Sequence, residues 1–140
     1  MGKEKEAETK LIKALRSKAA YAVHMDCTVD GFPDIFVVSS GVVSLIEMKE
    51  GNPSRKLRKA FEKTQPVFYL NSKMPRTFVC LFDGVEYYLY DAHSVYDAIC
   101  ASDDADFFDL DFITSGMSSH IAEEICDGSK RACGQSDFYN

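Results

Sequence analysis

Two short apolar segments in the first third of the chain, Ile35–Val38 and Val42–Met48, limit the possible folds more than any other feature. Both have the length and composition of β-strands, and Ser40-Gly41 stands between them. A glycine at the second turn position supplies the positive φ that a two-residue hairpin turn requires. The sequence therefore predicts an antiparallel β-hairpin across these segments.

The register of this hairpin brings two carboxylates together on one face. Asp34 lies opposite Glu47, and Lys49 projects from the same face as Glu47 because side chains alternate along a strand. Directly opposed carboxylates have Cβ atoms roughly 4.5–5.5 Å apart and repel each other. A divalent cation would offset the repulsion, because hard cations take carboxylate oxygens as ligands. The hairpin therefore predicts a metal site; the alternative is an ordinary hairpin with a surface Asp and Glu.

The same residues resemble a known nuclease signature. Pro33-Asp34, twelve intervening residues and then Glu47-Met48-Lys49 resemble the motif of the PD-(D/E)xK nuclease superfamily. Gly31 and Gln65 make the chain most similar to the virus-type replication-repair nuclease (VRR-NUC) and Holliday-junction-resolvase-like branch. The resemblance covers roughly residues 4–90 and does not reach the C-terminal part of the chain.

This resemblance implies a fold, an activity and a set of roles. The fold would be α/β and restriction-endonuclease-like, with an αβββαβ core, a mixed sheet flanked by helices and, here, a C-terminal helical extension. The activity would be Mg²⁺-dependent phosphodiester hydrolysis, with Mn²⁺ as a substitute. Asp34, Glu47 and the Met48 backbone carbonyl would hold the metal, and Lys49 would orient the attacking water or stabilise the pentavalent centre.

A helix before the hairpin adds a third acidic candidate. Residues 4–20 have apolar side chains at helical spacing and predict an amphipathic helix. In the resembled family a Glu on this helix often helps to hold the metal, and Glu4, Glu6 and Glu8 are the candidates. Glu8 is favoured because it lies three residues before Leu11, on the apolar face. Simple compensation of the helix dipole is the alternative role.

Gln65 is a further residue that the resemblance adds to the site. A helix is predicted to begin near Thr64, with Pro66 in its first turn, close to the end of the second hairpin strand. In the resembled family a Gln here contacts phosphate or the attacking water. A Pro precedes this Gln in many members, whereas Pro66 follows it here. A plain polar residue at a helix start is therefore the alternative.

Charge is segregated along the chain. Residues 1–100 hold 14 Lys and Arg against 13 Asp and Glu, whereas residues 101–140 hold 2 against 9. A basic segment follows the hairpin directly, and local clusters of this kind bind phosphate whatever the net charge; a solvated face is the alternative. We therefore expect nucleic acid as the partner, DNA rather than RNA, cleaved according to its structure because phosphate contacts do not read sequence. The nucleic-acid-binding candidates are Arg55, Lys56, Arg58, Lys59 and Lys63.

The chain of 140 residues has the length of one domain. We expect a nuclease-like domain over residues 1–100 and an acidic extension over 101–140 that packs on it and frays at its end. A second hypothesis is a non-catalytic nuclease-fold module that binds nucleic acid or protein and uses the acidic tail as a DNA mimic. A homodimer or higher homo-oligomer is also expected, since many nucleases of this type pair two sites to cut two strands.

The five cysteines are odd in number, are scattered and lack zinc-like spacing. They predict reduced thiols, which are typical of a cytosolic protein; the resemblance implies a viral origin and hence the host cytoplasm. No apolar run reaches the eighteen residues that a membrane span needs, so no membrane partner is expected.

The rest of the chain predicts a few further elements. These are a strand over 21–25, strands over 76–82 and 85–90 joined by a turn at Asp83-Gly84, a helix over 94–100 capped by Ser94, a helix over 117–127, and a frayed end over 128–140.

Overall fold

The computed structural model describes residues 2–25, 32–61 and 76–134. The predicted helix near Thr64 therefore lies outside the described residues, as do Lys63 and Gln65. The elements follow one another as α1 (Gly2–Ser17), β1 (Tyr21–His24), β2 (Ile35–Ser39), β3 (Val42–Glu50), α2 (Leu57–Ala60), β4 (Thr77–Phe82), β5 (Tyr87–Asp91), α4 (Ala92–Ala101), η1 (Phe107–Asp109), β6 (Thr114–Gly116) and α5 (Ser118–Ala132).

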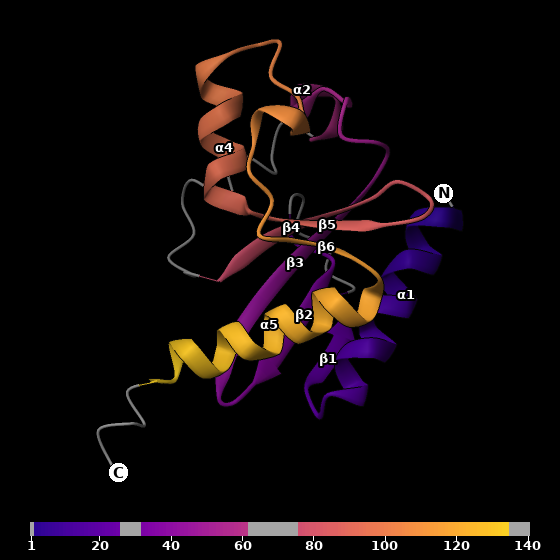
Figure 1. Ribbon diagram of the computed structural model, residues 1–140, viewed down its shortest axis with the longest axis vertical. Helices are drawn as coiled ribbons and strands as arrows, with labels where there is room; N and C mark the ends of the chain where they lie inside the picture. Colours follow the sequence, from indigo (N-terminus) through magenta and orange to yellow (C-terminus); the bar gives the residue numbers. More distant parts are fainter. Residues whose placement is uncertain (1, 26–31, 62–75, 135–140) are drawn as a thin grey trace.

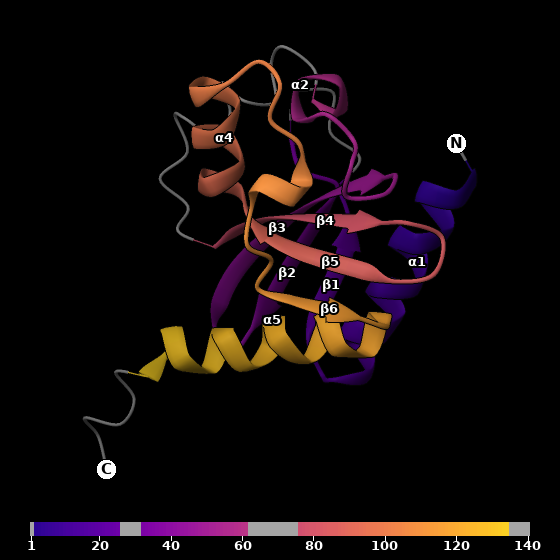
Figure 2. The same cartoon turned by 45° about the horizontal axis from the view of Figure 1, so that its top comes forward.

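One six-stranded sheet forms the centre of the molecule (Figures 1 and 2). Its strands lie in the order of the sequence, from β1 to β6. β3 and β4 are parallel, and every other neighbouring pair is antiparallel. The α/β class and the mixed sheet flanked by helices are therefore confirmed. The parallel pair needs a connection that crosses one face of the sheet, and α2 lies in that connection.

The predicted hairpin is present as β2 and β3. Ser40 and Gly41 both have positive φ, 53° and 73°, as a two-residue turn with the twist of the strands requires. The predicted register is confirmed across the whole ladder, from Ser39 opposite Val42 to Ile35 opposite Ile46. β3 continues two residues further than predicted and ends at Glu50.

Helices cover both faces of the sheet and form two cores (Figures 1 and 2). α1 and α5 cover one face, where Leu11 and Ile121 pack with Ile46 and Met48. α2 and α4 cover the other face, where Leu57 and other residues pack with β4 and β5. Because side chains alternate along β3, Ile46 and Met48 enter the first core while Glu47 projects on the opposite face.

Two predictions differ from the structure: the end of the first helix and the length of the loop between β4 and β5. The first helix ends at Ser17, three residues early, because Ala19 adopts a positive φ of 66° that stops the helix. The loop between β4 and β5 has four residues, since Phe82 faces Tyr87. Here the Asp83 carboxylate accepts hydrogen bonds from two loop backbone N–H groups, which favours the wider loop over the predicted two-residue turn.

Two helix boundaries in the second half also differ. Asp91 rather than Ser94 caps α4, because the Asp91 carboxylate accepts from the Ser94 backbone N–H. α5 runs five residues beyond its predicted end, so residues 128–132 are helical rather than frayed. The physical reason is packing: Gly128 is buried against the Arg76 guanidinium, which also donates to the Ile125 backbone carbonyl of α5 at 2.9 Å.

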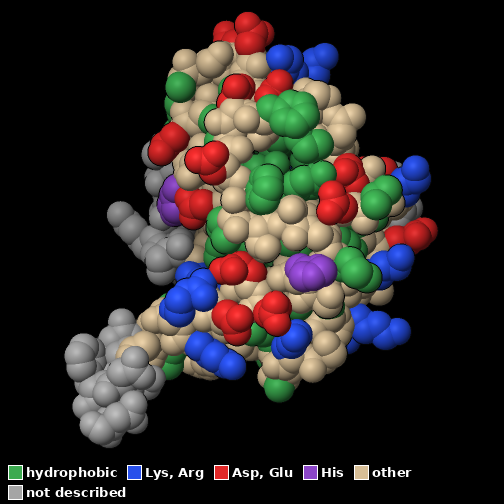
Figure 3. All heavy atoms as spheres, viewed as in Figure 1, with side chains coloured by type: hydrophobic (Ala, Val, Ile, Leu, Met, Phe, Trp, Pro, Cys, Tyr) green, Lys and Arg blue, Asp and Glu red, His purple; other side chains and the backbone are tan. Residues whose placement is uncertain are grey.

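The segment after residue 101 belongs to the same packed body. Ala105 and Phe107 are buried in the core beneath α2 and α4. β6 extends the sheet beside β5, and α5 packs on α1. Figure 3 shows many acidic side chains on the face that carries these elements. Among the described residues, no helix has both the length and the apolar character needed to cross a membrane.

Candidate metal-binding and catalytic site

Asp34 lies at the point where the β2–β3 ladder stops. The last paired residues are Ile35 and Ile46, and Pro33, which precedes Asp34, has no N–H to continue the ladder. The Asp34 carboxylate instead accepts a hydrogen bond of 2.8 Å from the Met48 backbone N–H. Its own backbone carbonyl accepts from the Met25 N–H at 2.7 Å, so both neighbouring strands fix its position.

Glu47 and Lys49 lie on the next strand and on one face of it. The Glu47 side chain is only 3 % exposed, and its carboxylate lies 3.2 Å from the Lys49 Nζ. The Lys49 ammonium also stands over the Phe61 ring, 4.8 Å from its centroid. Both neighbours hold Lys49 toward the sheet, on the side of Glu47, where the sequence register predicted it.

Glu8 reaches this region from α1. It is 4 % exposed although it is a carboxylate on the first turns of a helix. Its carboxylate accepts a hydrogen bond from the His24 ring on β1, and the Lys5 ammonium lies 3.8 Å away. Of the three acidic candidates on this helix, Glu8 is the buried one, whereas Glu4 is half-buried and Glu6 is exposed.

The electrostatics of Asp34 reflect these surroundings. Burial is the main cause that raises the pKa of Asp34 above its ordinary value, to about 6. The hydrogen bond from Met48 and the charge of Lys49 lower this pKa, whereas the negative charges of Glu8 and Glu4 raise it. The repulsion that raises the pKa of Asp34 therefore comes from two carboxylates on α1, Glu8 and Glu4, and not from the facing Glu47 that the sequence suggested.

The described residues at this site do not form a complete cage of metal ligands, but they suit Mg²⁺, which needs only one or two carboxylates. Within residues 2–25, 32–61 and 76–134, no group of three or more His, Cys, Asp or Glu is gathered to hold a metal ion. Mg²⁺ is usually bound by one or two carboxylates together with waters and substrate phosphates, so it does not need such a cage. Partly buried negative charge around Asp34 is the property that a divalent cation would offset.

The Met48 backbone carbonyl is directed to the same place. In a strand the N–H and the C=O of one residue point to the same side. The Met48 N–H points to the Asp34 carboxylate, and the ladder with β2 has already ended there. Asp34, Glu47 and the Met48 carbonyl thus form an oxygen-rich edge between β2 and β3, with Glu8 behind Asp34.

The predicted nucleic-acid-binding residues have partners that the sequence did not reveal. Lys56 Nζ donates to the Asp104 backbone carbonyl at 2.9 Å and lies 4.0 Å from the Asp106 carboxylate. Arg58 forms an ion pair of 2.8 Å with Asp103. The remaining described members differ: Arg55 donates to the Glu50 backbone carbonyl, and Lys59 is exposed.

Two contributors to the site go beyond the residues that sequence reasoning favoured. His24 binds Glu8, which lies 16 residues away. Glu4 acts on Asp34 through its charge. The position of Glu4 and Glu8 one helical turn apart was the available signal, because both then lie on one helix face.

No protein-family model matches the chain, and a search of curated proteins finds no match.

Proposed function

We propose that this chain is a metal-dependent nuclease that hydrolyses phosphodiester bonds, with a restriction-endonuclease-like fold and structure-directed cleavage of DNA. The observation that carries the proposal is that the Asp34 carboxylate binds the N–H of Met48, the residue between Glu47 and Lys49, where the β2–β3 ladder ends. Opposed, buried acidic groups are costly to a hairpin that serves only for stability. The buried Glu8 behind Asp34 adds to that cost.

The residues of the site would have separate roles in metal binding, charge stabilisation and positioning. Asp34, Glu47 and the Met48 carbonyl would hold Mg²⁺ or Mn²⁺, which, when bound, lowers the pKa of water and neutralises phosphate oxygens. Lys49 would stabilise the negative charge that develops on the phosphoryl group, because its ammonium is fixed beside Glu47 and over Phe61. His24 would keep the Glu8 carboxylate in place beside Asp34.

A non-catalytic binding module with the same fold is the second candidate. It is favoured by the contacts of the acidic segment Asp103–Asp106 with Lys56 and Arg58, since carboxylates there occupy the groups that would bind a nucleic-acid backbone. In that case the chain would bind nucleic acid or protein without cleaving it, and its acidic tail would act as a DNA mimic.

A cleavage assay distinguishes the nuclease from the non-catalytic binding module. Labelled single-stranded, duplex, flapped, nicked and four-way-junction DNA, with matching RNA, is incubated with Mg²⁺, Mn²⁺ or EDTA. We expect cleavage of at least one DNA structure with metal and none in EDTA. Asp34→Asn should abolish it because a metal-binding oxygen is replaced by an amide, whereas Asp97→Asn, at an exposed position on α4, should not. Cleavage in EDTA, or full activity in Asp34→Asn, would contradict the proposal.

A further inference from the structure

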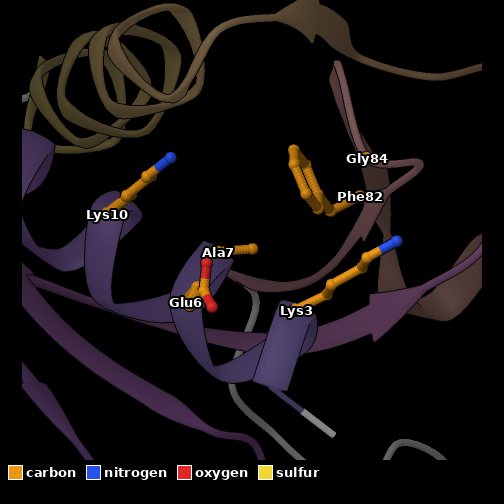
Figure 4. A pocket seen from close by; sticks show the side chains of 6 residues that line it. All are labelled: Lys3, Glu6, Ala7, Lys10, Phe82 and Gly84. Atoms are coloured by element: carbon orange, nitrogen blue, oxygen red, sulfur yellow. The ribbon is translucent and has the colours of Figure 1, made fainter.

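A small cavity lies between α1 and the end of β4, apart from the oxygen-rich edge described above. It has a volume of about 210 Å³, which is enough for part of a nucleotide. Figure 4 shows that Lys3 and Lys10 extend from α1 on either side of Ala7, with the Phe82 ring across from the helix. The lining residues are Lys3, Glu6, Ala7, Lys10, Phe82 and Gly84.

The charges in this cavity favour an anion. Lys3, Ala7 and Lys10 share one helix face because they are four and then three residues apart. Both lysines are exposed, and neither forms an ion pair with any carboxylate of the described chain. Glu6 contributes one negative charge, so the lining residues carry a net charge of +1, from two Lys minus one Glu.

The aromatic wall is held in place by its neighbours. The Phe82 ring packs against Tyr87, with 4.7 Å between the ring centroids. The Tyr87 hydroxyl in turn donates to the Ala7 backbone carbonyl at 3.1 Å. The ring and the lysine-bearing helix are therefore fixed relative to each other, and a base could stack on Phe82 without first ordering the cavity.

The cavity lies beside the end of β3, on the face of the sheet that α1 covers and opposite the face of Glu47 and Lys49. Phe82 pairs with Glu50 at the end of β3, one residue beyond Lys49, and its carbonyl accepts from the Gly51 N–H at 3.0 Å. On the other wall, Ala7 is the neighbour of Glu8 in α1. A strand bound at the metal site could therefore reach the cavity by passing around the end of β3.

We infer that this cavity is a nucleotide subsite: Lys3 and Lys10 bind a backbone phosphate of the substrate strand, and Phe82 stacks on a base. The inference rests on the proposed function, because it takes nucleic acid as the ligand. The subsite would let the substrate strand run along α1. This path adds to a basic cluster at α2, formed by Lys56 and Arg58, whose side chains already contact acidic residues.

The test measures binding without cleavage. Fluorescence anisotropy in EDTA gives the Kd for a labelled single-stranded DNA oligonucleotide and for the RNA of the same sequence. Lys10→Glu should raise the Kd about tenfold and reduce the dependence on salt, because a phosphate contact is lost. Lys13→Glu is the matched control: it reverses the same charge at an exposed position on the same helix outside the cavity.

Phe82→Leu provides the second readout, since stacking on an aromatic ring is lost while an apolar side chain remains. It should raise the Kd about fivefold or more, with a smaller change in salt dependence than Lys10→Glu gives. A circular-dichroism melt checks that this variant folds. If Phe82→Leu does not fold, Lys10→Glu still tests the subsite, because Lys10 is exposed.

The outcomes separate the inference from the proposed function. Equal effects of Lys10→Glu and Lys13→Glu would overturn the subsite even in a protein with metal-dependent cleavage. A selective loss with Lys10→Glu in a protein that cleaves nothing would support the subsite and contradict the nuclease. A selective loss with only one of the two oligonucleotides would support the subsite and identify the nucleic acid that it binds.

Discussion

At the scale of single residues, Asp34 has two roles that oppose each other. Its carboxylate accepts a hydrogen bond from the Met48 N–H and so extends the contact between β2 and β3 beyond their last paired residues. Yet burial and the charges of Glu8 and Glu4 raise its pKa, which means that its ionised form is unfavourable in the folded protein. A residue placed for stability alone would serve better as an amide, since an Asn oxygen accepts the same hydrogen bond.

This conflict predicts a particular dependence of stability on pH. The pKa of Asp34 is about 6 in the folded protein and 3.8 ordinarily, so the folded state binds its proton more tightly. Stability should therefore fall as the pH rises from about 4 through about 6, by at most about 3 kcal/mol. Urea unfolding of wild type and Asp34→Asn in EDTA at pH 4 and pH 8 isolates this residue.

At pH 8, Asp34→Asn should be as stable as wild type or more so, and its advantage should shrink at pH 4. Asp97→Asn is the control, because this exposed carboxylate carries no such conflict. If Asp34→Asn is clearly less stable at pH 8, the hydrogen bond to Met48 outweighs the charge, and Asp34 is chiefly a structural cap.

At the scale of elements, the hairpin could be predicted from sequence because its determinants are local. Ser40-Gly41 fixes the turn, and the turn fixes the register that brings Asp34 beside Glu47. The four-residue loop after β4 was missed because Asp83 reorganises it through side-chain hydrogen bonds that a turn dipeptide does not reveal. The length of α5 was missed because Gly128 reads as a stop signal, whereas Arg76 packs against it from a distant part of the chain.

The contact between α2 and the acidic segment could not be predicted either, because it joins residues that are far apart in the sequence. Lys56 and Asp104 are 48 residues apart, and each segment alone resembles a solvated charged loop. Backbone bonds join them too, since the Leu57 N–H donates to the Ala105 carbonyl at 2.9 Å. The acidic segment therefore faces the basic cluster, and its charges should reduce the affinity of that cluster for phosphate.

This arrangement predicts that removing acidic charge strengthens nucleic-acid binding. In the double variant Asp103→Asn/Asp106→Asn, the Kd for a DNA oligonucleotide should fall about two- to fivefold, because Lys56 and Arg58 lose competing carboxylates. Folding should change little, because an Asn at position 106 can still accept the Phe108 N–H that Asp106 caps, and ion pairs near the surface contribute at most about 1 kcal/mol each. Asp97→Asn/Asp111→Asn is the control, and an equal fall in its Kd would show a general charge effect only.

At the scale of the whole molecule, the acidic extension completes both layers of the fold. Phe107 lies in the core with α2 and α4, and Ile121 lies in the core with α1. The sequence after residue 101 indicated an acidic extension that packs on the first hundred residues. It could not indicate which face it covers, because that depends on contacts with elements far away in the sequence.

Two neighbouring phenylalanines test whether the acidic extension forms part of the core. Phe107 is 1 % exposed and Phe108 is 70 % exposed. Phe107→Ala should lower the free energy of unfolding by about 3–5 kcal/mol, because it leaves a cavity in the core. Phe108→Ala should change it by less than about 0.5 kcal/mol. Equal values from urea denaturation of the two variants would mean that this segment does not form part of the core.

The central claim is that Asp34 helps to hold a divalent cation, and thermal melts in EDTA and in Mn²⁺ test it most directly. A ligand that binds only the folded state at ten times its Kd adds about 1.4 kcal/mol, or about 4 °C in Tm for a chain of this size. Mn²⁺ should raise the Tm of wild type and of Asp97→Asn by this amount, and that of Asp34→Asn by much less. Equal increases in all three proteins would contradict the claim.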